Sequence, residues 1–105
     1  MRTQAEIFYG NSASNTYEGL CANADFAEIT ANAVNNGADA DSIMTAADAT
    51  AAAWDAAVCH DDSTGWAVAV PLTDSVSATP SLWCADATGA SKSTAALAAS
   101  DYECP

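Results

Sequence analysis

Positive charge is nearly absent from this chain. Its 105 residues include only two basic side chains, Arg2 and Lys92, against 14 acidic ones, and the formal net charge is −12. A protein with this charge repels nucleic acid phosphates and anionic membrane surfaces, so direct binding to either is not expected. Two interpretations of the charge stay open. It keeps the protein soluble at high concentration or high salt, or it serves a specific cation site.

Residues that carry most catalytic chemistry are also scarce. His60 is the only histidine, and it stands beside Asp61 and Asp62 in an expected turn, which indicates a solvated loop position rather than a general base. No serine lies in a G-x-S-x-G context, and the sequence has no Walker loop or dinucleotide-binding fingerprint. The carboxylate pairs Asp39/Asp41 and Asp61/Asp62 arise by chance in so acidic a chain. We therefore expect neither an enzyme nor a bound cofactor.

Four cysteines are the strongest positive signal: Cys21, Cys59, Cys84 and Cys104. An even number at wide, irregular spacing in about 100 residues is typical of a disulfide framework. Zinc sites usually bring cysteines in C-x-x-C pairs, which this sequence lacks, and free or metal-bound thiols are the alternative. Two disulfides contribute about 3–4 kcal/mol each and persist outside the reducing cytosol. The periplasm, a cell surface or the medium is the expected location.

Long hydrophobic runs are missing as well. No stretch of about 18 apolar residues offers a membrane span, and residues 1–10 lack the apolar core of a signal peptide. Because a disulfide protein must be exported, we expect the natural polypeptide to carry a further segment before Met1. The length fits one domain over residues 1–105.

The chain divides into a helical front half and a run of strands. This layout predicts an α+β fold with an antiparallel sheet of three or four strands. The expected helices are 2–9, a segment capped by Asn23 or Asp25 that continues to about Val34, and the alanine-rich segment 41–53. Residues 54–60 are ambiguous between helix and strand, and residues 61–65 are expected to form a turn. Strands are expected over 66–70, where Pro71 ends the strand, and over 81–86 and 91–96. Residues 97–105 are expected to form a tail that Cys104 pins.

One loop offers the donors that a cation prefers. Asp39 and Asp41 follow Asn35, Asn36 and Gly37, and Ca²⁺ takes six to eight such oxygens. The spacing does not follow the EF-hand pattern. A solvated loop that caps a helix is therefore the competing interpretation.

Three tryptophans are candidates for a ligand surface. Trp54, Trp66 and Trp83 would form a sugar-binding platform if they were exposed together, but tryptophans on adjacent strands more often pack in the core or as cross-strand pairs. The packing interpretation is favoured for any of them that proves buried.

Several strings, taken in order, resemble the soluble part of a bacterial type IV pilin or of the related pseudopilins. Arg2–Tyr9 resembles the end of the family's long N-terminal helix, and Tyr17-Glu18-Gly19-Leu20-Cys21 resembles its Tyr-x-Gly-x-Cys string. Cys59 followed by Trp66-Ala67-Val68-Ala69-Val70-Pro71-Leu72 resembles its strand that ends in Pro-Leu. The remaining strings are Trp83-Cys84-Ala85-Asp86-Ala87-Thr88-Gly89 and Cys104-Pro105. The family's hydrophobic N-terminal helix and its glutamate are not in this sequence.

The resemblance implies a structural role without catalysis. Subunits of the family are held in the inner membrane by the hydrophobic helix and then stack it into an extracellular filament, with the heads outside. The expected partners are other pilin subunits through that missing helix, and the isolated head is expected to be a monomer. Among three possible connectivities, we choose Cys21–Cys59, which ties the loop after the first helix to the first strand, and Cys84–Cys104, which anchors the tail. The alternative is a small secreted, disulfide-stabilised module that binds sugar or calcium.

Overall fold

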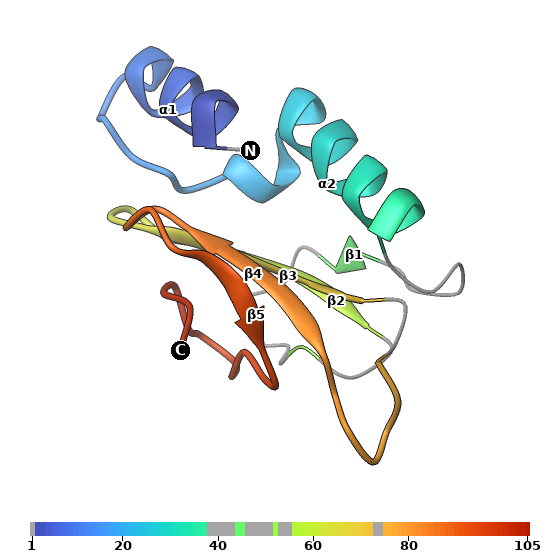
Figure 1. The fold of residues 1–105 in the computed structure, drawn as a ribbon. Helices are drawn as coiled ribbons and strands as arrows, with labels where there is room; N and C mark the ends of the chain where they lie inside the picture. The colour runs from blue at the N-terminus through green and yellow to red at the C-terminus, as the bar shows by residue number, and fades with distance from the viewer. Residues whose placement is uncertain (1, 38–43, 46–51, 53–55, 73–74) are drawn as a thin grey trace.

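Two helices and a mixed five-stranded sheet form the described part of the chain. The computed structural model describes residues 2–37, 44–45, 52, 56–72 and 75–105. The elements are α1 (Arg2–Asn11), a 3₁₀ turn η1 (Leu20–Ala22), α2 (Ala24–Gly37), β1 (Met44–Thr45), β2 (Ala57–Asp61), β3 (Trp66–Pro71), β4 (Leu82–Asp86) and β5 (Ser91–Thr94). Both helices lie over one face of the sheet, and the C-terminal tail lies against the other (Figure 1). The expected α+β class is confirmed.

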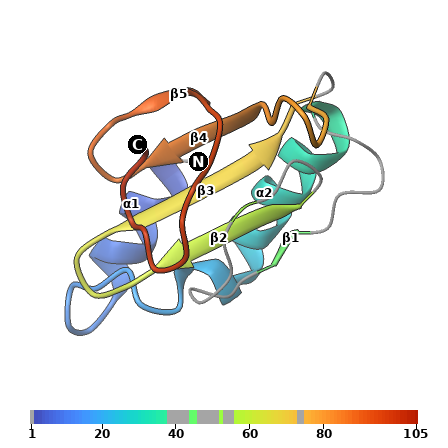
Figure 2. The ribbon, with the colours of Figure 1, turned by 90° about the horizontal axis from the view of Figure 1, so that it is seen from below.

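The strands follow one another across the sheet in chain order, β1 to β5. Strands β2 to β5 pair antiparallel, as expected, whereas β1 pairs in parallel with β2 at the edge of the sheet. Figure 2 shows this order from the side of the tail. The prediction of a helix over residues 41–53 is wrong at Met44–Thr45, which form β1. Apart from Ala52, the rest of that segment lies outside the described residues. Alanine's helix propensity is a weak preference that pairing with a sheet edge overrides.

Strand β3 lies at the centre of the molecule, and all six of its residues are buried. Successive side chains of a strand point to opposite faces. Trp66, Val68 and Val70 belong to the core under the helices, while Ala67 and Ala69 belong to the core under the tail. Small side chains on the second face leave room for the tail to approach the sheet closely.

Helix α2 begins where the sequence indicates. The Oδ1 atom of Asn23 accepts hydrogen bonds from the backbone N–H groups of Asp25 and Phe26, at 3.1 and 3.2 Å, which is an N-cap. Phe26 is fully buried and meets Trp66 edge-on, with ring centroids 5.5 Å apart. The helix continues to Gly37, slightly beyond the expected end near Val34.

Helix α1 is held by a few contacts at its inner side. Ala5 is its one fully buried residue, and Ile7 is half exposed. Tyr17, from the loop that follows, stacks on Tyr9 with centroids 4.6 Å apart and donates a hydrogen bond of 2.7 Å to Glu6. The loop thus clamps the helix onto the domain.

The tail after β5 is folded back onto the sheet. Leu97 is fully buried in the core that contains Ala67 and Ala69. Further along, the Cys84–Cys104 disulfide joins the tail to β4. The expected tail pinned by Cys104 is therefore present, and it covers the face of the sheet opposite to the helices.

Candidate functional site

The two disulfides lie on opposite faces of the sheet. Cys21–Cys59 joins η1 to β2 within the core under the helices, and Cys84–Cys104 joins β4 to the tail on the other face. Both Cα–Cα distances are 5.8 Å. These are the pairs chosen from the sequence, and the structure has no free cysteine, so the metal-bound alternative is not realised. Disulfides are typical of proteins that work outside the reducing cytosol.

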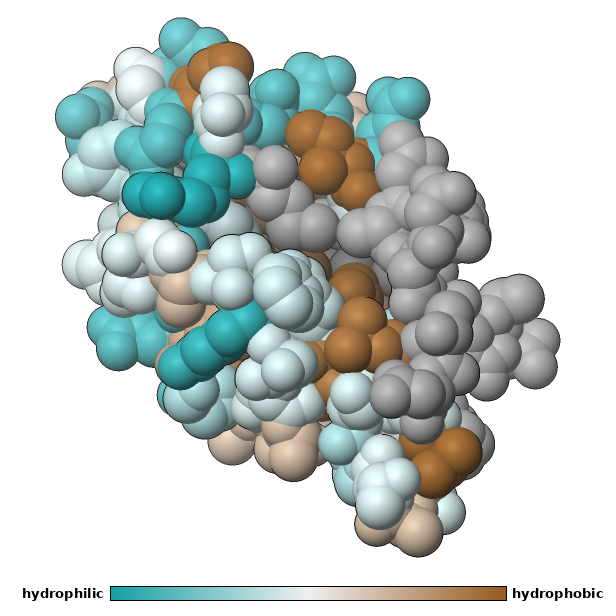
Figure 3. All heavy atoms as spheres, viewed as in Figure 1, coloured by the Kyte–Doolittle hydropathy of each residue, from teal (hydrophilic) through white to brown (hydrophobic). Residues whose placement is uncertain are grey.

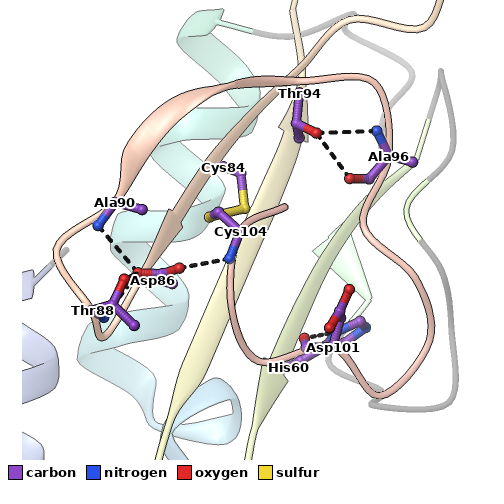
Figure 4. Close-up of a disulfide and its surroundings, with 9 residues drawn as sticks. All are labelled: His60, Cys84, Asp86, Thr88, Ala90, Thr94, Ala96, Asp101 and Cys104. Carbon is purple, nitrogen blue, oxygen red and sulfur yellow. Dashed lines mark hydrogen bonds between the residues drawn. A yellow bond between two sulfur atoms is a disulfide. The ribbon is translucent and has the colours of Figure 1, made fainter.

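His60 is not a loop residue, contrary to the expectation. It lies in β2 and is fully buried, and its Nδ1 atom is 2.8 Å from the backbone carbonyl oxygen of Asp101, which fixes one ring nitrogen against the tail (Figure 4). Its ring also meets Tyr102 edge-on, at 6.2 Å between centroids. The turn begins later than expected, because the strand extends through Asp61 and its alternation directs His60 toward the tail.

The neighbouring aspartates Asp61 and Asp62 have separate structural tasks. Asp61 accepts hydrogen bonds from the backbone N–H groups of Gly19 and Cys21, at 3.3 and 2.7 Å. Asp62 closes the β2–β3 turn by accepting from Thr64 and Gly65. Burial opposes ionisation of Asp62, but these hydrogen bonds outweigh it and lower its pKa. Each of the two carboxylates is thus engaged by the backbone of a different loop.

Asp86 is the third aspartate that holds backbone groups, and it is almost completely buried. Its Oδ1 atom accepts from the N–H and hydroxyl of Thr88 and from the N–H of Ala90, and its Oδ2 atom accepts from the N–H of Cys104 at 2.6 Å (Figure 4). Burial disfavours the charged form, yet the hydrogen bonds from Thr88, Cys104 and Ala90 outweigh it and lower the pKa of Asp86. The carboxylate is therefore ionised at neutral pH.

Tyr17 is the one tyrosine in the described part of the chain whose pKa is strongly raised. Burial, together with the hydrogen bond to the Glu6 carboxylate, raises the pKa of Tyr17 to about 12. Both effects favour the neutral phenol, because ionisation would remove the donated proton and place two negative charges side by side. The contact is structural, since it joins α1 to the loop.

The tryptophans do not form a platform in the described structure. Trp66 is buried in the core, where its indole N–H has no hydrogen-bond partner, and Trp54 lies outside the described residues. Trp83 is 40 % exposed on β4. The packing interpretation is thus correct for Trp66, and Trp83 is available for an external contact.

A polar cavity of about 330 Å³ lies where the two β-turns meet the tail. Its lining includes Asp62, Thr64, Thr88, Asp101, Tyr102 and Glu103. Carboxylates, hydroxyls and one aromatic ring are groups that suit a sugar or an amine. Sequence reasoning missed this place, because it brings together residues 40 positions apart that only the folded tail juxtaposes.

A second surface runs along the outer side of α1. A shallow groove of about 500 Å³ is lined by Arg2, Thr3, Glu6 and Ile7. On the face seen in Figure 3, the described residues show several patches of hydrophobic surface. Ile7, Val76 and Trp83 are the large apolar side chains exposed in the described residues. Within the part of the chain that the structure describes, these side chains are contact points of modest size.

The described residues contain no group of three or more potential ligands that could hold a metal ion. Asp39 and Asp41 of the candidate calcium loop lie outside the described residues, whereas Asn35, Asn36 and Gly37 belong to α2. Among the described helices none has the length and apolar character needed to cross a membrane. A comparison with models of known protein families, with curated proteins and with solved structures found no match for this chain.

Proposed function

We propose that this chain is the globular head of a type IV pilin-like subunit and has a structural role in an extracellular filament. The observation that carries the proposal is the way α1 is attached. It packs through Ala5, Tyr9 and the Tyr17 clamp, while Ile7 is half exposed beside a shallow groove. A helix that keeps such an exposed side is suited to pack there against neighbouring subunits.

The order of the elements supports the same proposal. The strings that resemble the pilin family fall on α1, on the loop through η1, on β3 and on β4, in that order. Both disulfides crosslink segments that are distant in the sequence, which suits a head that must persist outside the cell. The mechanism is packing, and it needs no catalytic group.

Immunolabelling of surface filaments tests this proposal. Antibodies raised against the 105-residue chain should decorate filaments sheared from the source cells, and peptides of this chain should be recovered from the sheared fraction. Serum absorbed with the purified chain is the control and should label nothing. Recovery of the chain only as a free protein in the medium would contradict the filament role.

The polar cavity beside the tail favours a second candidate, a secreted module that binds a sugar. It combines Tyr102 with the carboxylates of Asp62 and Glu103 and with threonine hydroxyls. This candidate predicts the outcome that contradicts the first, which is a free protein in the medium. The same fractionation therefore distinguishes the two.

A further inference from the structure

Each disulfide has an aspartate beside it in the same arrangement. On β2, Cys59 is followed two residues later by Asp61, and the Oδ2 atom of Asp61 accepts a hydrogen bond of 2.7 Å from the N–H of Cys21, the disulfide partner of Cys59. On β4, Cys84 is followed two residues later by Asp86, whose Oδ2 atom accepts a hydrogen bond of 2.6 Å from the N–H of Cys104.

The Cys-x-Asp spacing has a simple geometric basis. Residues two apart on a strand point to the same face, so each carboxylate lies on the same face of its strand as the sulfur of the strand cysteine. The other carboxylate oxygen is also occupied, by Gly19 in one case and by Thr88 and Ala90 in the other. The same device therefore occurs twice, on opposite faces of the sheet.

We propose that Asp61 and Asp86 are positioning residues for disulfide formation. Each carboxylate holds the backbone of the distant cysteine next to the strand cysteine before the sulfurs are joined, and thereby selects the native pair. The paired cysteines are separated by 38 and 20 residues. Closing loops of these lengths costs considerable chain entropy if no other contact holds the two cysteines near each other. A hydrogen bond to a charged acceptor is strong enough to bias the choice.

The chemical step itself is ordinary thiol–disulfide exchange. One cysteine thiolate attacks oxidised glutathione and releases one glutathione thiolate, and the second cysteine thiolate attacks the mixed disulfide and releases the other. In total, two protein thiols and one oxidised glutathione give one protein disulfide and two reduced glutathiones. The aspartates take no part in electron transfer and act by raising the local concentration of the correct partner.

The test is refolding of the reduced full chain in a glutathione buffer. Asp61→Asn and Asp86→Asn are suitable changes, because asparagine directs an N–H₂ group at one of the N–H donors. At equilibrium, Asp61→Asn should lower the constant for Cys21–Cys59 formation about tenfold and leave Cys84–Cys104 within about twofold. Asp86→Asn should do the reverse. Alkylation followed by peptide mapping measures both pairs in the same sample.

Exposed carboxylates near the distant cysteines provide matched controls. Glu18→Gln and Glu103→Gln remove the same charge from exposed side chains, and should leave both constants within about twofold. Equal weakening of both disulfides in each aspartate variant would show general destabilisation and overturn the proposal. No change in the adjacent disulfide, or an equal effect of the glutamine controls, would overturn it too.

Early refolding gives a measurement that does not need a folded product. In the parent chain, the first one-disulfide species should be enriched in the two native pairs beyond what their loop lengths predict. Asp61→Asn should remove this enrichment for Cys21–Cys59 alone, even if that variant never reaches the folded state. The absence of any native enrichment in the parent would overturn the proposal.

Discussion

Single polar side chains fix the loops and the tail of this protein. Asp61, Asp62 and Asp86 each accept several backbone hydrogen bonds, and His60 makes one with the tail. Buried polar groups cost free energy unless they are paired. The acidic residues that looked like a dispersed surface charge therefore include some that are structural.

Tyr17 gives a test at high pH. Its folded-state pKa of about 12 lies above the usual tyrosine value of about 10, so the neutral phenol stabilises the folded state. That contribution is complete below pH 10 and is lost as pH rises from about 10 through 12. Urea unfolding should show a fall on the order of 2 kcal/mol across this window.

Tyr17→Phe should remove most of that fall, since phenylalanine does not titrate. It should also be less stable at pH 7 by about 1–2 kcal/mol, because the hydrogen bond to Glu6 is lost. An equally steep alkaline fall in this variant would mean that another group causes it. The exposed change Glu18→Gln serves as a control for altered charge.

At the scale of elements, the two disulfides differ in the length of chain that they close. The separations are 38 residues for Cys21–Cys59 and 20 for Cys84–Cys104. The chain-entropy model gives about 4 and about 3 kcal/mol for loops of these lengths. Replacing each pair by alanines should lower the free energy of unfolding in that order, as measured by urea denaturation. The reverse order would show that packing of the tail, rather than loop length, dominates.

Element assignments were most secure where turns and periodicity agreed. The hairpin of β2 and β3 is predicted by the turn residues before Trp66 and by the alternation after them, although β2 extends through Asp61. Helix α2 is predicted by its Asn23 cap. The alanine-rich segment that contains β1 predicts a helix, because helix propensity is a local preference and does not depend on whether a sheet edge lies nearby. Short edge strands form through pairing rather than through intrinsic preference.

For the whole molecule, charge repulsion is the dominant long-range force. The net charge is −12, and the radius of gyration is 12.6 Å. In about 20 mM salt the Debye length is roughly 20 Å, so charges over the entire surface of two neighbours repel one another. The exposed apolar side chains, such as Ile7 and Trp83, offer only small contacts against this repulsion.

We therefore expect the isolated chain to be monomeric in sedimentation experiments at about 20 mM salt. High salt or millimolar calcium should weaken the repulsion and permit association of any assembled form. Sodium chloride at matched ionic strength is the control that separates screening from specific calcium binding. A stable dimer at low salt, with a large apolar interface, would contradict the view that the acidic surface keeps heads apart.

The sequence alone determined the α+β class, the antiparallel sheet and most element positions, because these depend on local caps, turns and alternation. The disulfide pairs were also chosen from it, by the need to anchor the tail at Cys104. Only the tertiary structure decided that His60 is buried, that Asp61 and Asp86 hold the backbones of Cys21 and Cys104, and that the tail forms a polar cavity. These contacts join residues that are 18 to 42 positions apart in the sequence. Caps, turns and alternation involve only neighbouring residues, so they do not predict which distant residues meet.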